Sequence, residues 1–249
     1  MFRAPLLAAT LALTALPAAA FEIGEMSDAE RETFRAEIRA YLLDNPEVLM
    51  EAIGVLEERQ AAEQAQGDVA LVANHADALF NDGYSYVGGN PDGDITIVEF
   101  MDYRCGYCKK AFPEVESLIE ADGNIRFIVK EFPILGEQSV VASRFAIATL
   151  QVAGPEAYKS VHDAMMQMRG DYNEAALTAL AEKAGTDPAP ILAAMNSDEV
   201  SAVIAENRTL AQAMQISGTP TFVLEDQMLR GYVPLQAMTN IVDEVRDAR

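Results

Sequence analysis

Two cysteines, Cys105 and Cys108, stand three positions apart and are the only cysteines of the chain. We expect a strand before them and a helix after them. Residues 95–100 are apolar and largely β-branched, as in a buried strand, and residues 109–121 carry apolar side chains at helical spacing. We therefore expect Cys105 at the N-terminus of a helix, with Cys108 one turn further into it.

That position gives the two thiols different chemistry. Unpaired N–H groups and the positive end of the helix dipole stabilise a thiolate, so we expect the pKa of Cys105 to lie below that of an ordinary thiol. Cys105 is therefore the predicted nucleophile, which attacks a disulfide. Cys108 is expected to be more enclosed and to resolve the mixed disulfide by displacing the substrate thiol.

Other uses of the pair fit the sequence less well. A structural zinc site needs about four ligands, but there is no third cysteine, and His75 and His162 lie far from the pair in sequence. A c-type haem needs a histidine directly after the second cysteine, where Lys109 stands. A purely structural disulfide would close a small ring and restrain little chain entropy. We expect neither a metal nor a cofactor.

Residues 1–20 have the pattern of a secretory signal peptide. Arg3 supplies positive charge, residues 6–16 are apolar, and residues 18–20 are three alanines that suit cleavage after Ala20. The apolar stretch is too short for a membrane span, and no later apolar run approaches about 20 residues. We expect a soluble mature protein, exported to an oxidising compartment in which disulfides persist.

The chain is strongly acidic, with a formal net charge of −21. This charge makes it a poor candidate for binding nucleic acid or anionic membranes. Residues 21–82 are the most acidic part, with 15 acidic and 4 basic side chains. We expect residues 21–82 to form a separate extension and residues 83–249 to form the main domain.

The extension reads as helical. Ser27 and Glu30 have the spacing of a capping box, and Asn45 and Pro46 mark the start of a second helix. The apolar stripe of this second helix continues past residue 57 at a spacing close to a heptad, but it is narrow and rich in alanine. Two interpretations remain open: the stripe packs on the chain's own main domain, or residues 21–66 associate with other copies in a symmetric oligomer.

The main domain alternates strands and helices, which indicates an α/β layer. Strands are expected at residues 84–87, 95–100, 125–132, 221–224 and 228–232, helices throughout residues 139–215, and a final helix from Pro234. The methionines of the helical block are Met165, Met166, Met168, Met195 and Met214. They belong to the core or line an adaptable peptide-binding surface.

This order resembles the DsbA-like branch of the thioredoxin superfamily, in which a helical insertion interrupts a thioredoxin fold. The resemblance rests on the strand, Cys105–Cys108 and helix unit, the helical block at 139–215, and Thr219-Pro220 before a strand. It implies that the Thr219–Pro220 bond is cis and that both residues face Cys105. It also implies that Glu99 is a buried acid for proton transfer near the resolving cysteine, with Lys130 as the candidate partner.

The two residues between the cysteines refine the expected activity. Oxidase-type DsbA proteins carry Pro-His there, whereas Gly106 and Tyr107 resemble the DsbC isomerases, whose cis-proline also follows a threonine. Residues 26–66 are similar to the extension of ScsC-like suppressor of copper sensitivity proteins and of 27 kDa outer-membrane-antigen proteins. The resemblance implies a periplasmic isomerase or reductase that acts on exported proteins with cysteines, is kept reduced by a membrane thiol partner, and forms a homo-oligomer.

Three alternatives remain at this stage. The chain could be a monomeric DsbA-like dithiol oxidase, which redox potential and oligomeric state would distinguish. It could be a copper-handling protein that uses Cys105 and Cys108 as soft ligands. It could also be an acidic interaction protein whose cysteines have no role. Isomerase activity and self-association support each other, because linked active sites raise their effective concentration around one misfolded client.

Overall fold

The computed structural model describes residues 26–248, so the expected signal peptide and its cleavage after Ala20 lie outside the described residues. The chain divides into two compact units between Arg59 and Gln60. The sequence placed this boundary later, between residues 82 and 83. Each unit is described by itself below.

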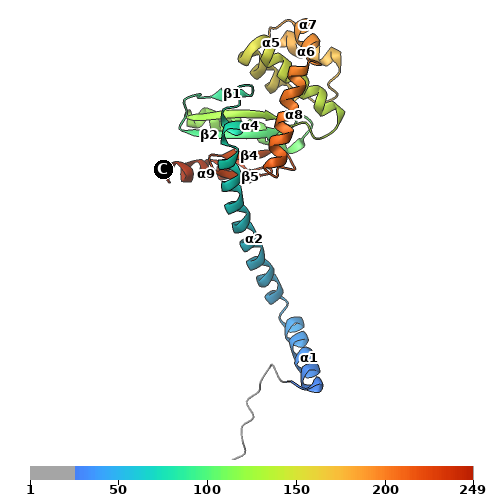
Figure 1. Cartoon of the computed structure of the whole chain (residues 1–249), viewed down its shortest axis with the longest axis vertical. Helices are drawn as coiled ribbons and strands as arrows, with labels where there is room; N and C mark the ends of the chain where they lie inside the picture. Colours follow the sequence, from blue (N-terminus) through green and yellow to red (C-terminus); the bar gives the residue numbers. More distant parts are fainter. Residues whose placement is uncertain (1–25, 249) are drawn as a thin grey trace, which may run out of the picture. The chain divides into compact units, whose positions relative to one another are not determined.

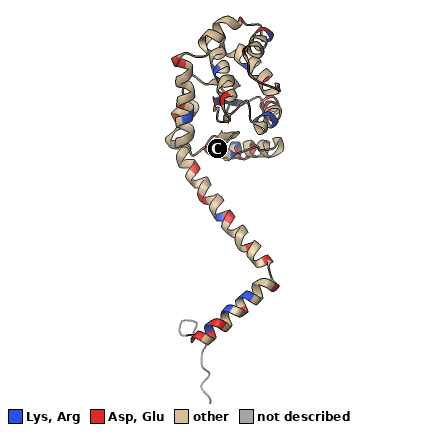
Figure 2. Cartoon of the chain, turned by 90° about the vertical axis from the view of Figure 1, so that its right-hand side faces the viewer, with Lys and Arg blue, Asp and Glu red and all other residues tan. Residues whose placement is uncertain are grey.

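The first unit holds α1 (Asp28–Asp44) and the beginning of α2 (Glu47–Asn74). The expected capping box is present, because the backbone N–H of Glu30 donates to the Ser27 hydroxyl and the Glu30 carboxylate accepts from the Ser27 backbone N–H. Acidic and basic residues follow one another along α1 (Figure 2), and none of its residues is buried. Eight large apolar side chains among the described residues of this unit are exposed: Ile38, Tyr41, Leu43, Leu49, Met50, Ile53, Val55 and Leu56.

The second unit is built on a five-stranded sheet with the order β1-β3-β2-β4-β5 (Figure 1). The strands are β1 (Tyr86–Gly89), β2 (Ile95–Met101), β3 (Ile125–Glu131), β4 (Thr221–Leu224) and β5 (Gln227–Arg230). β2 and β3 are parallel, and the other neighbouring pairs are antiparallel. The two central strands, β2 and β3, are buried along almost their whole length because helices cover both faces of the sheet.

Each face of the sheet packs against its own helices. On one face lie α4 (Gly106–Asp122) and α9 (Leu235–Asp247), whose buried side chains share a core with Ile97 and Met101 of β2. The other face packs against the end of α2 and against α3 (Ala76–Phe80), through Val72 and Leu79. The end of α2 therefore belongs to the second unit, which explains why that unit begins before residue 83.

Four helices form the insertion between β3 and β4. They are α5 (Glu137–Gln167), α6 (Glu174–Lys183), α7 (Pro188–Ala194) and α8 (Asp198–Ala213). α5 is two helices joined at Gly154, whose φ of 84° places it in the left-handed region that glycine tolerates. Four of the five methionines noted above, all except Met168, are buried in the core. The predicted fold, a DsbA-like thioredoxin fold with inserted helices and a helical N-terminal region, is confirmed.

Candidate active site

Cys105 is the N-cap of α4, directly after β2. Its backbone is extended, and its sulfur lies 3.4 Å from the backbone nitrogen of Cys108, which donates to it. The Cys105 thiol donates to the carbonyl oxygen of Thr219 at 3.2 Å. Both cysteines are free thiols in this structure. The predicted position at the start of a helix is therefore the observed one.

The environments of the two sulfurs differ as a nucleophile and a resolving thiol require. The hydrogen bond from the Cys108 thiol, together with donors from Thr219 and the backbone, lowers the pKa of Cys105 to about 5. Burial raises the pKa of Cys108 far above that of an ordinary thiol, and the neighbouring Cys105 and Glu99 raise it further. Cys105 is 6% exposed and Cys108 is 0% exposed, so an incoming disulfide meets Cys105.

Glu99 lies on β2 beneath the dithiol and is 3% exposed. Its Oε1 atom has no hydrogen-bond partner within the described part of the chain. Burial raises the pKa of Glu99 to about 8, and the negative charges of Cys105, Glu116 and Glu131 contribute further. Glu99 is therefore protonated near neutral pH while the Cys105 thiolate is present.

Lys130 is not the partner of Glu99, and the sequence-based expectation for it is wrong. Glu99 pairs in register with Val129 of β3, so Lys130 points to the opposite face of the sheet. Its buried ammonium group forms an ion pair with Asp82 and donates to the carbonyl oxygen of Ala78 at 2.7 Å. Lys130 therefore holds the connection between α3 and β1 against the sheet.

The loop before β4 lies against the dithiol. The Thr219–Pro220 peptide bond is cis, as the family resemblance implied. Because β4 pairs antiparallel with β2, this loop lies at the end of β2 where Cys105 stands. Thr219 faces Cys105 through its carbonyl oxygen.

The residues between the cysteines are accessible. Gly106 is exposed and has open space around its Cα. Tyr107 is 64% exposed and stacks on Tyr232 with a ring-centroid distance of 6.5 Å. The Tyr232 hydroxyl donates to Glu114 on α4 at 2.6 Å. The rim of the site is therefore partly aromatic.

Two buried carboxylates near the site were not singled out from the sequence. Asp102 accepts the backbone N–H groups of Arg104, Ile134 and Leu135, at 2.7, 2.8 and 3.0 Å. It therefore fixes the loop after β3 beside the loop that carries Cys105. The only local signal was its place at the end of a strand.

Glu131, at the end of β3, accepts hydroxyl groups from three separate segments. Tyr103 donates at 2.9 Å, Tyr158 at 2.7 Å and Ser143 at 2.7 Å. Burial raises the pKa of Glu131 to about 7 despite these hydrogen bonds. Glu131 joins the active-site loop to both halves of α5.

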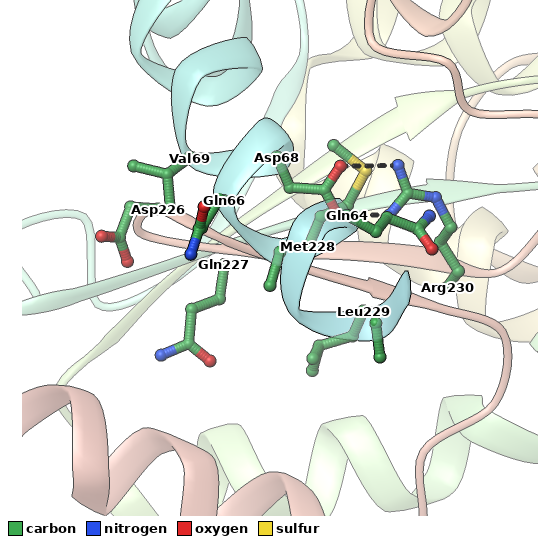
Figure 3. Close-up of a pocket in the computed structure, with 11 residues that line it drawn as sticks. Gln64, Gln66, Asp68, Val69, Asp226, Gln227, Met228, Leu229 and Arg230 are labelled. Carbon is green, nitrogen blue, oxygen red and sulfur yellow. Dashed lines mark hydrogen bonds and ion pairs between the residues drawn. The ribbon is translucent and has the colours of Figure 1, made fainter. Parts of the chain in front are cut away.

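A cavity of 610 Å³ lies on a different part of the second unit, between α2 and β5 (Figure 3). The ion pair of Asp68 with Arg230 closes one side of it, and Met228 and Leu229 supply apolar surface. No residue of the dithiol motif lines it.

Residues 26–248 contain no group of three or more His, Cys, Asp or Glu side chains arranged to hold a metal ion. None of the helices in this range combines the length and the apolar character needed to cross a bilayer.

Two family models match the chain in different places. The model described as "DSBA-like thioredoxin domain" matches residues 96–243. The model described as "Copper resistance protein ScsC N-terminal domain" matches residues 30–63. The first match contains the dithiol, the helical insertion and the cis-proline loop.

Solved structures agree with these matches. A thioredoxin-like oxidoreductase from Silicibacter pomeroyi DSS-3 is 42% identical, with a TM-score of 0.65 over 70% of this chain and 98% of that chain. Proteus mirabilis ScsC in a transitional conformation is 30% identical, with a TM-score of 0.66 over 92% of this chain and 100% of that chain. A periplasmic thioredoxin-like protein from Salmonella enterica serovar Typhimurium is 30% identical, with a TM-score of 0.63 over 68% of this chain and 94% of that chain.

Among curated sequences, the Na(+)/H(+) antiporter NhaA 1 of Salinispora arenicola is 27% identical over 158 residues. The alignment covers 63% of this chain but only 24% of that antiporter. The likeness therefore concerns one part of a longer protein.

Proposed function

Because the chain belongs to the family of DSBA-like thioredoxin domains, we propose that it is a periplasmic disulfide isomerase or reductase that acts on exported proteins. Family membership makes it a thiol–disulfide oxidoreductase. The observation that carries the proposal is the pair of free thiols at the start of α4, where Cys105 is the more exposed of the two and has a low pKa, and Cys108 is fully buried. The periplasmic location is supported by the signal-peptide pattern and by the description of the Salmonella protein.

The reaction begins at Cys105. Its thiolate attacks one sulfur of a client disulfide, a new bond forms between Cys105 and the client, and the second client sulfur leaves as a thiolate. In isomerisation, a different client thiolate attacks the client sulfur of the mixed disulfide and regenerates the Cys105 thiolate. In reduction, Cys108 loses its proton and attacks the sulfur of Cys105, so the client leaves with two thiols and the protein holds a disulfide.

We infer that Glu99 accepts the proton of Cys108 in the second route. The Cys105 thiolate is one of the charges that raise the pKa of Glu99. When Cys105 enters a mixed disulfide its charge disappears, which removes one cause of the raised pKa of Glu99 and increases the fraction of Glu99 that is ionised, although burial still raises this pKa. A carboxylate then stands beside the Cys108 thiol at the step in which that thiol must lose its proton.

The direction of the reaction is proposed from the residues between the cysteines. Gly106 and Tyr107 replace the Pro-His pair of oxidases. Without the histidine we expect a less stabilised thiolate and a disulfide that is harder to reduce, which favours a protein kept reduced by a membrane thiol partner. A redox potential as oxidising as that of a Pro-His protein would support the oxidase alternative instead.

Self-association through residues 21–66 is the second part of the proposal. α1 has no buried residue, although it carries Ile38, Tyr41 and Leu43. Helices of this length are marginal in water without packing partners. The match of residues 30–63 to the ScsC N-terminal domain supports a dedicated role for this region, and further copies of the same helix would cover its apolar side chains.

A refolding assay tests both parts. The mature protein and a shorter chain that begins at Gln60 are given a substrate with scrambled disulfides, and light scattering gives the mass of each. The shorter chain keeps Asp68, Val72 and Leu79, which pack on the sheet. We expect the mature protein to be oligomeric and to rescue the substrate, and the shorter one to be monomeric and poor at rescue. Two monomers that only oxidise reduced substrate would overturn the isomerase proposal.

Copper handling is a second candidate, favoured by the description of the N-terminal family model. Cys105 and Cys108 would supply two soft sulfur ligands for Cu(I). Stoichiometric, tight Cu(I) binding by a protein that does not exchange disulfides would favour this candidate over the first.

A further inference from the structure

A groove lies beside the dithiol, between the first turns of α4 and the end of α5. It has a volume of 330 Å³, which suits a few side chains of an extended peptide rather than a large ligand. The residues of its lining that matter here are Lys109, Phe112 and Pro113 from α4, and Met166, Met168 and Arg169 from the end of α5 and the loop after it.

The groove begins one helical turn from the nucleophile. The backbone N–H of Lys109 donates to the carbonyl oxygen of Cys105 at 3.1 Å, and side chains four positions apart on a helix are neighbours. The Lys109 ammonium group donates to the carbonyl oxygen of Met168 and lies 3.4 Å from the Tyr172 hydroxyl. A peptide in this groove would therefore lie next to Cys105.

The charges at this end of α4 are unusual for the chain. α1, α2, α5, α6 and α8 each have an acidic residue in their first turn, which suits the helix dipole. α4, α7 and α9 have none there, but only in α4 do two lysines, Lys109 and Lys110, follow within the first five residues. Positive charge at a helix N-terminus does not stabilise the helix. In a chain of net charge −21, two lysines at this position therefore indicate a role other than stabilising the helix.

Three positive charges lie close together at the groove. Arg104 donates to the carbonyl oxygen of Gly170 at 2.8 Å, which holds it near the loop that carries Arg169. Burial lowers the pKa of Lys109, and the charges of Arg104 and Arg169 lower it further, so the three groups repel one another. Arg169 is exposed and forms no ion pair within residues 26–248. Arg104 already forms an exposed ion pair with Asp171 at 3.7 Å, which neutralises part of this charge. Lys109, like Arg169, forms no ion pair within the described residues, so an anion beside these two groups would relieve the repulsion that remains.

The floor of the groove is apolar. Phe112 is half-buried and Met166 is 3% exposed. Methionine side chains adapt their shape to different apolar partners. The groove therefore combines an apolar floor with a positively charged rim, and both lie beside the sulfur that reacts.

We propose that this groove binds the client segment next to the reacting cysteine, and that it selects segments in which an acidic residue lies near an apolar one. This inference rests on the function proposed above. It gives an acidic protein a local means of attracting acidic clients, which its overall charge would otherwise repel. The side chains that set the preference are Lys109 and Arg169 at the rim and Phe112 and Met166 at the floor.

The test compares two synthetic peptides. Each carries a leucine and one cysteine, activated as a disulfide with 2-thiopyridine; one peptide has two glutamates and the other has two glutamines in their place. The Cys105 thiolate attacks the peptide sulfur, forms the Cys105–peptide disulfide and, with uptake of a proton, releases 2-thiopyridone, whose absorbance is followed. The charged positions lie several residues from the cysteine, and the rate of each peptide with dithiothreitol corrects for intrinsic reactivity.

We expect the reduced full-length protein to react about fivefold faster with the glutamate peptide at low salt, and this ratio to approach one at about 0.5 M salt because screening weakens exposed charge interactions. Arg169→Gln should lower the ratio by about half or more. Lys183→Gln, which removes an exposed positive charge on α6 outside the groove, should leave the ratio unchanged. A third peptide, with serine in place of leucine, should react more slowly than its parent.

The possible failures are distinguishable. Equal rates for the two charged variants, or a ratio that Arg169→Gln does not change, would overturn the groove proposal while leaving thiol exchange intact. No reaction with either peptide, although both react with dithiothreitol, would overturn the proposed function itself. Thermal unfolding of Arg169→Gln and Lys183→Gln checks that both variants are folded.

Discussion

The thiol of Cys105 lies 3.2 Å from the carbonyl oxygen of Thr219, the residue before the cis-proline. Cys105 follows the end of β2 and Thr219 precedes the start of β4, and these strands are neighbours in the sheet although they are far apart in sequence. A client chain that approaches Cys105 therefore meets the backbone of residues 218–220 at the same time. The same pair of strands brings Cys105 and the backbone of residues 218–220 together.

Replacing each cysteine should separate the two steps of exchange. Cys105→Ser should lower the rate of exchange by about a thousandfold or more, because the attacking group is lost. Cys108→Ser should still attack but should accumulate mixed disulfides with client proteins, which mass spectrometry of non-reduced samples detects. If instead Cys108→Ser loses the first step and Cys105→Ser traps clients, the assigned roles are reversed.

Alkylation of the reduced protein should report the low pKa of Cys105. The rate with iodoacetamide should rise through a midpoint near pH 5 and level off above it, because the pKa of Cys105 is lowered to about 5. Cys105→Ser should remove this phase, since the pKa of Cys108 is raised. A midpoint above about pH 8, as for an unperturbed thiol, would contradict the arrangement at the start of α4.

The same pKa makes stability depend on redox state and pH. A thiol whose pKa is lower in the folded than in the unfolded state stabilises the folded state above the unfolded pKa, and this contribution is lost as the pH falls through the folded value. Glu99 acts with the opposite sign over nearly the same range, so the test uses Glu99→Gln. In that variant the free energy of unfolding of the reduced form, relative to the oxidised form, should increase between pH 5 and about pH 8.5. Denaturant titrations of both forms at several pH values measure this difference, and a constant difference would contradict it.

Glu99→Gln should stabilise the reduced protein and slow the resolving step. A carboxyl whose folded pKa is raised from about 4.5 to about 8 loses stability as the pH rises between those values. Removing that carboxyl should add about 3 kcal/mol at pH 7 as an order of magnitude. The rate at which Cys108 displaces a client from Cys105 should fall, and its pH profile should lose the inflection due to Glu99 while still rising with pH as Cys108 ionises. An unchanged pH profile would show that Glu99 takes no part.

Replacing Lys130 should affect stability without affecting the resolving step. Lys130→Met leaves Asp82 buried without its partner, so it should destabilise the protein by about 3 kcal/mol or more. Asp82→Asn in the same chain should recover part of that loss. The pH profile of the resolving step should not change in the double variant, because Lys130 lies on the other face of the sheet from Glu99. A shifted profile would mean that the two groups interact.

Local features of the site could be predicted from the sequence because they depend on neighbouring residues. The strand, the turn and the helix around Cys105 follow from hydrophobic spacing, and they place the thiol at a helix N-terminus. The role of Lys130 could not be obtained in this way. It depends on the register between β2 and β3, which sets which side chains share a face, and no local pattern reports that register.

Glu131 was missed for a related reason. Its three hydroxyl donors come from residues 103, 143 and 158, so the site exists only once the helical insertion has folded onto β3. The start of the second unit could not be predicted for the same reason. α2 is one continuous helix, and only its last turns pack on the sheet. Helical periodicity does not show where along a helix such packing begins.

The exposed apolar side chains of the first unit provide the last prediction. Ile53 is 47% exposed and Met50 is 67% exposed, and in an oligomer formed through residues 21–66 both would be covered by other copies. Replacing Ile53 by Glu should place a charge in that interface and dissociate the oligomer.

Arg31→Glu on α1 serves as a charge-changing control, since a solvated position tolerates the change. Light scattering should give a smaller mass for Ile53→Glu than for the control at the same concentration. Rescue of scrambled substrate should fall with the mass, while alkylation of Cys105 should not change, because the thiol environment lies entirely in the second unit. Dissociation with full rescue would show that isomerase activity does not need the oligomer.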